Sequence, residues 1–128
     1  MQPNNPQKFT EKAWQAIANV QDIAKNNQQQ QVETEHLFKS LIEEEGLASS
    51  IFYKADVSVQ SLRNKVDQFI NSQPKVSNSN GSVFLGRSLD SLLDRAEKYR
   101  TEFGDDYISI EHLVLGFTKD DRFGRKLL

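Results

Sequence analysis

Val32-Glu33-Thr34-Glu35-His36-Leu37-Phe38 and Ile108-Ser109-Ile110-Glu111-His112-Leu113-Val114 are two versions of one stretch, separated by 76 residues. When residues 9–52 are placed on residues 85–128 at this single offset, both partners are apolar at 13 of the 44 positions. Independent placement of the same apolar residues would give roughly seven such positions. The only two histidines of the chain fall on each other. The sequence therefore contains one structural unit twice.

The spacing of apolar residues predicts that this unit is helical. In residues 9–26, five apolar side chains fall within an arc of about 80° on a helix, which gives one narrow buried stripe. The stripe consists of Phe9, Ala13, Ile17, Val20 and Ala24. Thr10 is the expected N-cap of this helix. The Gln28–Gln31 run that follows is short and is interpreted as a solvated turn.

Three further helices complete the first copy. The second is expected to start at Glu33 or Thr34 and to end at Gly46, the third to span about residues 47–54, and the fourth to start near Ser58. The fourth helix carries an apolar face made of Val59, Leu62, Val66, Phe69 and Ile70. We therefore expect repeat one at about residues 9–70, followed by a polar linker at residues 71–84.

The second copy occupies about residues 85–128. Its first helix is expected to bury a matching stripe of Leu85, Leu89, Leu93, Ala96 and Phe103. Gly104 should make the next turn, Ser109 should cap the next helix, and Asp120-Asp121 should form a solvated start for a short helix. The counterpart of the fourth helix would fall at about residues 134–146. The sequence thus predicts an all-α, pseudo-twofold pair of four-helix repeats in one domain, with the second repeat incomplete.

Composition excludes several classes of function. The chain carries 16 basic and 18 acidic residues, for a net charge of −2, and it has no basic cluster of the kind that binds nucleic acid. It has no cysteine, no signal-peptide pattern at its start, and no apolar run near the about 18 residues of a membrane span. These features predict a cytoplasmic domain with no nucleic-acid or membrane partner.

The Glu35-His36 and Glu111-His112 pairs suggest a metal site or acid–base pair, but their spacing does not favour either. A helical zinc site of the H-E-x-x-H type needs a second histidine four residues away, and neither copy has one. We interpret both imidazoles as packed and hydrogen-bonded near the start of a helix. The sequence also lacks a Ser-His-Asp order, a G-x-S-x-G motif and a phosphate-binding loop. We therefore predict no catalytic residue, metal ligand or cofactor for this chain.

Apolar residues that occur in only one copy need an explanation other than the shared core. Positions that hold a charged or polar residue in the sister copy are expected near water, because unpaired charge is rarely buried. The pairs are Trp14 with Asp90, Phe103 with Asn27, Tyr107 with Gln31, Ile110 with Thr34, and Leu115 with Lys39. Two explanations stay open. These side chains join the two copies to each other, or they line an exposed apolar groove that binds unfolded polypeptide.

The ordered set of motifs resembles the Clp N-terminal repeat domain, most of all that of the ClpB-type AAA+ disaggregase chaperones. The resemblance covers residues 9–128 and rests on the two Glu-His-Leu motifs, Phe9-Thr10-Glu11-Lys12, Gly46-Leu47-Ala48 and Leu85-Gly86-Arg87-Ser88-Leu89. It implies a non-catalytic module that weakly binds exposed apolar segments of unfolded or aggregated client proteins. The alternative is an adaptor domain that docks a folded partner.

The resemblance also implies cofactors, partners and site residues. For the full-length protein these are ATP and magnesium, a hexameric state and a cooperating chaperone or adaptor, whereas the fragment is expected to be monomeric and free of cofactors. Thr10, Asp105 and Glu111 match the substrate-contact surface of the family, and the unmatched apolar residues extend it. The expected substrate-binding set is Thr10, Trp14, Asp105, Tyr107, Ile110 and Glu111. Related ClpC-type domains use the glutamate of each Glu-His motif for phosphorylated arginine, which would add Glu35, but Ile110 here replaces the threonine of that form.

Overall fold

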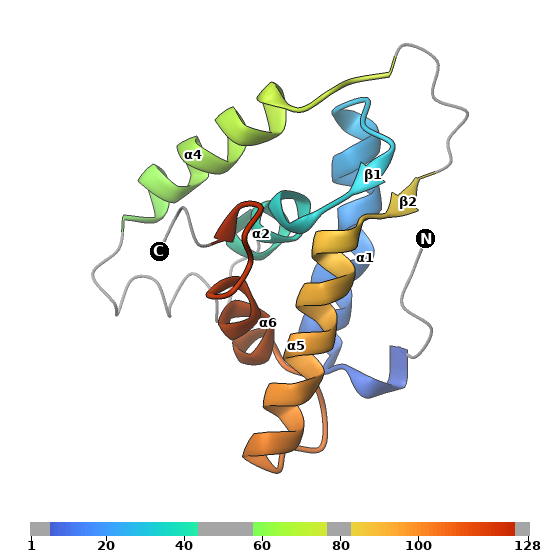
Figure 1. The fold of residues 1–128 in the computed structure, drawn as a ribbon, viewed down its shortest axis with the longest axis vertical. Coiled ribbons are helices and arrows are strands. Elements are labelled where there is room, and N and C mark those ends of the chain that lie inside the picture. The colour runs from blue at the N-terminus through green and yellow to red at the C-terminus, as the bar shows by residue number, and fades with distance from the viewer. Residues whose placement is uncertain (1–5, 44–57, 77–82, 125–128) are drawn as a thin grey trace.

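The elements follow one another in the order that the repeat predicts (Figure 1). The computed structural model describes residues 6–43, 58–76 and 83–124. Repeat one contributes the 3₁₀ turn η1 (Pro6–Lys8), helix α1 (Glu11–Asn26), strand β1 (Gln31–Val32), helix α2 (Thr34–Glu43) and helix α4 (Val59–Ser72). Repeat two contributes strand β2 (Phe84–Leu85), helix α5 (Arg87–Phe103) and helix α6 (Ile110–Phe117). The predicted helical fold class is confirmed, while the expected helix at 47–54 and its preceding Gly46 lie outside the described residues.

Two short backbone pairings show the pseudo-twofold relation directly. Val32 of β1 pairs in parallel with Leu85 of β2, and Phe9 forms an isolated parallel bridge with Ile108. The repeat offset turns the first pair into the second. The hydrogen bonds agree, since the Gly86 amide donates to the Val32 carbonyl at 2.8 Å and the Thr10 amide donates to the Ile108 carbonyl at 3.0 Å. The sequence predicted neither pairing, because two-residue strands leave no periodic pattern.

The contacts between helices follow the same pseudo-twofold symmetry. Within the repeats α1 packs on α2 and α5 packs on α6, and across the repeats α2 contacts α5 while α1 contacts α6. Helix α4 packs on α2. The fully buried side chains of this core include Val20, Leu37, Phe38, Leu62, Leu92, Leu113 and Phe117. The core is therefore shared by both repeats rather than divided between them.

The buried stripe of α5 departs from the prediction at two positions. Leu89, Leu92 and Ala96 are the buried residues of the helix, whereas Leu93 is only partly buried. Phe103, placed at the end of that stripe by its spacing, is 58% exposed. The stripe prediction was wrong at these two positions, because the core of α5 follows Leu92, which aligns with the buried Ala16 of α1.

The first turn of α1 is capped by a residue of its own repeat, whereas the first turn of α5 is capped by a residue of the other repeat. Thr10 is the N-cap of α1, as predicted, and its Oγ1 accepts a hydrogen bond from the Ala13 amide at 3.2 Å. The residue that aligns with it, Gly86, has no side chain, and Oε1 of Glu33 from repeat one accepts from the Leu89 amide at 3.1 Å instead. A Cβ on Gly86 would lie 2.1 Å from Glu33 Cδ, so glycine makes room for this cap.

The two repeats also share a left-handed residue after their first helix. Gln28 has φ 58° and the aligned Gly104 has φ 71°. Gln28→Gly is expected to stabilise the domain by about 0.5–1 kcal/mol, because glycine adopts this conformation without a Cβ penalty. Gly104→Ala, with no atom within 4 Å of the added Cβ, should destabilise by about 1 kcal/mol through backbone strain alone. Thermal unfolding of both variants measures the two changes in stability, which should have opposite signs. Changes of the same sign would contradict the prediction.

The Gln28–Gln31 run is less solvated than predicted. Gln29 is buried, the Gln28 carbonyl accepts from the Val76 amide at 2.8 Å, and the Gln30 carbonyl accepts from the Phe84 amide at 2.7 Å. The Gln28–Gln31 run is thus hydrogen-bonded to the described residues at both ends of the linker. Among the described residues, no helix is long and apolar enough to cross a bilayer.

Candidate functional site

The two Glu-His motifs share one hydrogen-bond arrangement at the start of α2 and α6. The amides of Glu33 and Ser109 donate to Nδ1 of His36 and His112 at 2.9 and 2.8 Å. Nδ1 is therefore an acceptor, which leaves the proton on Nε2. Nε2 of His36 contacts Gln29 Oε1 at 2.6 Å, and Nε2 of His112 contacts the aligned Asp105 Oδ2 at 2.8 Å. Both imidazoles are buried and structural, as the sequence indicated.

The partners of the two histidines differ in one respect. The amide of Gln29 continues the chain of hydrogen bonds, because its Nε2 donates to the Ile70 carbonyl at the end of α4 at 2.6 Å. Asp105 carries only acceptor oxygens and has no donor for such a link. Its side chain remains 53% exposed. The histidine network is therefore closed by a helix end in repeat one and faces solvent in repeat two.

The glutamates of the two motifs also have different surroundings. Glu35 is fully buried and pairs with Arg122, whose Nε and Nη2 lie 2.8 and 2.9 Å from the two carboxylate oxygens. This two-point geometry is the strong form of an Arg–carboxylate pair. Arg122 Nη2 also donates to Gln73 Oε1 at 3.2 Å, and the guanidinium lies 5.7 Å from the Phe69 ring centroid. Glu111, by contrast, is exposed.

Burial and neighbouring charges shift three pKa values around this pair. Burial raises the pKa of Glu33, against the opposing effects of the Leu89 amide and Arg122. Burial also lowers the pKa of His36, so its neutral form is favoured. The hydrogen bonds to Glu35 raise the pKa of Arg122, which keeps the guanidinium charged. The guanidinium of Arg122 is therefore the permanent positive charge that pairs with Glu35.

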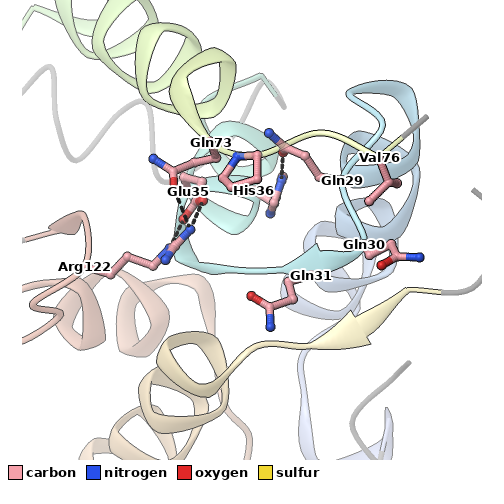
Figure 2. A pocket seen from close by; sticks show the side chains of 9 residues that line it. Gln29, Gln30, Gln31, Glu35, His36, Gln73, Val76 and Arg122 are labelled. Carbon is pink, nitrogen blue, oxygen red and sulfur yellow. Dashed lines mark hydrogen bonds and ion pairs between the residues drawn. The ribbon is translucent and has the colours of Figure 1, made fainter. Parts of the chain in front are cut away.

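A polar hollow of about 240 Å³ opens beside the pair (Figure 2). Arg122 and Glu35 point toward each other at its side, and Gln29 lies against His36. Its lining comes from the loop and strand before α2, the first turn of α2, the segment after α4 and the segment after α6: Gln29, Gln30, Gln31, Glu35, His36, Gln73, Pro74, Val76 and Arg122. Sequence reasoning missed this site, because Arg122 aligns with Gly46 and the repeat therefore gave no signal for it.

The repeat offset carries this hollow onto the predicted site in repeat two. Gln29, Gln30, Gln31 and Glu35 map onto Asp105, Asp106, Tyr107 and Glu111, and all four of these residues are exposed. Tyr107 is 54% exposed, and the neighbouring Phe103, which packs against His112 with ring centroids 5.8 Å apart, is 58% exposed. We call this surface, formed by Phe103, Asp105, Asp106, Tyr107 and Glu111, the acidic aromatic patch.

The other three predicted site residues lie at the starts of α1 and α6. Thr10 is joined to Ile108 by a backbone hydrogen bond, which places the start of α1 beside Tyr107. Trp14 is partly buried against the core, with its ring centroid 5.7 Å from that of Phe9. Ile110 is only 5% exposed, so the expectation that this position lies near water was wrong. Its partner in the repeat, Thr34, is also buried, which identifies the position as core despite the hydroxyl.

Two further expectations for site residues changed in the structure. Glu35, which the family resemblance suggested for phosphorylated arginine, has both carboxylate oxygens bonded to Arg122. Asp120, expected in solvent, is 2% exposed, and its Oδ2 accepts from the amides of Phe123 and Gly124 at 3.0 and 2.8 Å. Among the described residues, no three His, Cys, Asp or Glu side chains gather in a way that could hold a metal ion.

Comparisons with known proteins give relatives for nearly the whole chain. The chain is 61% identical over 129 residues to the chaperone protein ClpB of Gloeobacter violaceus, and 60% identical over 127 residues to the chaperone protein ClpB 2 of Nostoc sp.. These matches cover 100% and 99% of this chain but 15% of each relative, so the chain spans a small part of their length.

Solved structures of low sequence identity share the fold. The N-terminal domain of Hsp104 from Candida albicans superposes with a TM-score of 0.85 at 18% identity, covering 94% of this chain and 79% of that one. The N-terminal domain of the ClpV1 ATPase from E. coli gives 0.81 at 18% identity, covering 96% and 72%. A family model described as the Clp repeat (R) N-terminal domain matches residues 8–128. The chain belongs to the Clp repeat (R) N-terminal domain family.

Proposed function

We propose that this domain is the substrate-recognition module of an ATP-driven disaggregating chaperone. It weakly binds exposed apolar segments of unfolded or aggregated client proteins through the acidic aromatic patch, and it performs no chemistry itself. The observation that supports this most directly is the exposure of Phe103 and Tyr107 beside Asp105 and Glu111. Their aligned residues in repeat one are Asn27 and Gln31, so the core does not require these aromatic rings.

The size of the patch favours weak binding. Two half-exposed aromatic side chains would bury on the order of 200 Å² on a client, worth about 5 kcal/mol at about 25 cal/mol per Å². Association itself costs about 4–15 kcal/mol, so further contacts are needed for a stable complex. A captured segment is therefore released readily, which suits a module that transfers its client to another part of the protein.

The charges of the patch give it a preference among clients. Asp105, Asp106 and Glu111, which lie within four residues of Tyr107 in the chain, are all exposed. Acidic segments would be repelled, whereas segments with basic side chains next to aromatic or aliphatic ones would be favoured. The preference should weaken as salt is added, because exposed charges are screened within about 10 Å at about 0.1 M ionic strength.

The proposal is tested by titrating the isotopically labelled chain with a reduced, unfolded model protein while amide shifts are recorded. We expect shifts at residues 103–107 and at Glu111. Tyr107→Ser should weaken binding about fivefold to tenfold, a loss of about 1–1.4 kcal/mol. Phe84→Ser is the matched control, because Phe84 is an aromatic residue of similar exposure, 59%, on β2 and outside the patch.

Equal effects of the two serine variants would contradict the assignment of the patch. The adaptor alternative gives a different outcome: unfolded proteins would leave the spectrum unchanged, and only a specific folded partner would shift it.

A further inference from the structure

The turn between α5 and α6 carries three neighbouring residues of the acidic aromatic patch, Asp105, Asp106 and Tyr107. It begins after the left-handed Gly104 and ends at Ile108, which forms a backbone bridge to repeat one. The three patch residues are exposed, so burial in the core does not fix their positions. Their arrangement therefore depends on the contacts that hold the backbone of the turn.

Both backbone groups of Asp105 are bonded to one residue, Arg100 in the last turn of α5. The Asp105 amide donates to the Arg100 carbonyl at 3.0 Å, and Nη1 of Arg100 donates to the Asp105 carbonyl at 2.8 Å. The carboxylate of Asp105 is held separately, by Nε2 of His112 at 2.8 Å. Asp105 is thus fixed at its amide, its carbonyl and its carboxylate.

The guanidinium of Arg100 is itself held in place by an ion pair within α5. Its Nε and Nη2 lie 2.9 and 2.6 Å from the two carboxylate oxygens of Glu97. The hydrogen bonds from Arg100 lower the pKa of Glu97, which keeps the carboxylate ionised at neutral pH. A two-point pair of this kind fixes the plane of the guanidinium. Nη1 is therefore directed at the turn by a side chain of defined conformation.

Repeat one supports the equivalent turn in another way. The residue that aligns with Arg100 is the fully buried Ala24, whose carbonyl accepts from the Gln29 amide at 2.9 Å and which has no side-chain donor. There the carboxamide of Gln29 donates to the Ile70 carbonyl at the end of α4 at 2.6 Å. Asp105 carries no donor for such a link. In repeat two, Arg100 thus does from within α5 what a further helix does in repeat one, and the side chains of the turn stay uncovered.

We infer that Arg100 is a positioning residue for client binding, because it holds the turn that presents Asp105, Asp106 and Tyr107. This inference rests on the proposed function, since it concerns the acidic aromatic patch. A loop that is ordered before binding loses less conformational entropy when the client binds. Arg100 therefore strengthens binding through the backbone, although its charge has the wrong sign for the basic clients that the patch favours.

These two effects of Arg100 have opposite signs, which makes them separable. A capped peptide in which phenylalanine alternates with arginine is titrated into the labelled wild type and into Arg100→Gln. At about 1 M salt, where charges are screened within about 3 Å, only the positioning effect remains. We expect the Kd of Arg100→Gln to be about threefold to tenfold above that of the wild type at this salt. At low salt the ratio should be smaller, because removal of the positive charge favours the basic peptide. An equal or lower Kd at about 1 M salt overturns the inference.

Lys98→Gln is the matched control. It removes another exposed positive charge from α5, on a side chain about 160° around the helix from Arg100. Its Kd should equal that of the wild type, and a rise equal to that of Arg100→Gln overturns the inference. If Arg100→Gln does not fold, Arg100→Lys replaces it, because an ammonium keeps the charge and loses the two-point pair. The lysine variant should show a smaller rise at the same salt, and no rise overturns the inference.

Nuclear spin relaxation of the free chains gives a second readout, which does not depend on the peptide. The amides of residues 105–107 should have lower order parameters in Arg100→Gln than in the wild type, whereas Lys98→Gln should leave them unchanged. Equal order parameters in Arg100→Gln and the wild type overturn the inference and leave the proposed function intact. A wild type without peptide-induced shifts at residues 103–107 and Glu111 overturns the proposed function, and the inference with it.

Discussion

Leu92→Ala is expected to lower the free energy of unfolding by about 3–5 kcal/mol, the upper part of the range for buried leucines. Leu92 has no exposed surface and lies where α5 packs on α6. A Cβ placed on Gly116 of α6 would lie 3.1 Å from Leu92 Cγ, so the two helices already approach closely. A void at this contact cannot be filled by a small shift of one side chain. Urea denaturation followed by circular dichroism measures the loss.

Leu93→Ala is the control for this prediction. The same atoms are removed from the next residue, but Leu93 is partly buried at the edge of the core. Its loss should be about 1–2 kcal/mol, because part of its surface is already in water. Equal losses at Leu92 and Leu93 would contradict the assignment of Leu92, in place of Leu93, to the buried stripe of α5.

Arg122→Ala is expected to cost about 3–5 kcal/mol, since it leaves the carboxylate of Glu35 buried without its partner. Glu35 has no exposed surface, and Arg122 supplies both of its close hydrogen bonds. The hollow beside the pair admits water to the abandoned carboxylate, which favours the lower half of that range. Urea denaturation of this variant at neutral pH measures the effect.

A double-mutant cycle separates the ion pair from the packing of its side chains. Glu35→Gln together with Arg122→Ala should cost less than Arg122→Ala alone, because the buried group at position 35 then carries no unpaired charge. Additive losses in the cycle would show that the side chains stabilise the domain by packing and not by pairing.

Much of the fold could be predicted because the chain contains its own comparison. The offset of 76 residues identified the positions shared by both repeats, and helices α1, α2, α5 and α6 lie where that comparison placed them, while α4 lies where its own apolar spacing predicted it. The cap formed by Thr10 and the structural role of both histidines also followed from local sequence. Local patterns of caps and apolar spacing carry this information within a few residues.

The candidate site could be predicted only in part, because some of its contacts join residues far apart in the chain. Arg122 meets Glu35 across 87 positions, and no periodic pattern reports such a pair. Ile110 was placed at the surface because Thr34 was assumed to be solvated, yet that threonine is buried and its hydroxyl has no partner among the described residues. A polar residue in the sister copy is therefore weaker evidence of exposure than a charged one.

The carboxylate of Glu33 caps the first turn of α5, and this contact makes one repeat depend on the other. Repeat one carries a carboxylate that the first helix of repeat two requires, and Gly86 has no side chain that could replace it. Repeat two therefore depends on repeat one to cap its first helix. Replacement of one repeat by that of a distant relative would have to keep Glu33 and Gly86 together. The two repeats are therefore expected to evolve as a single unit.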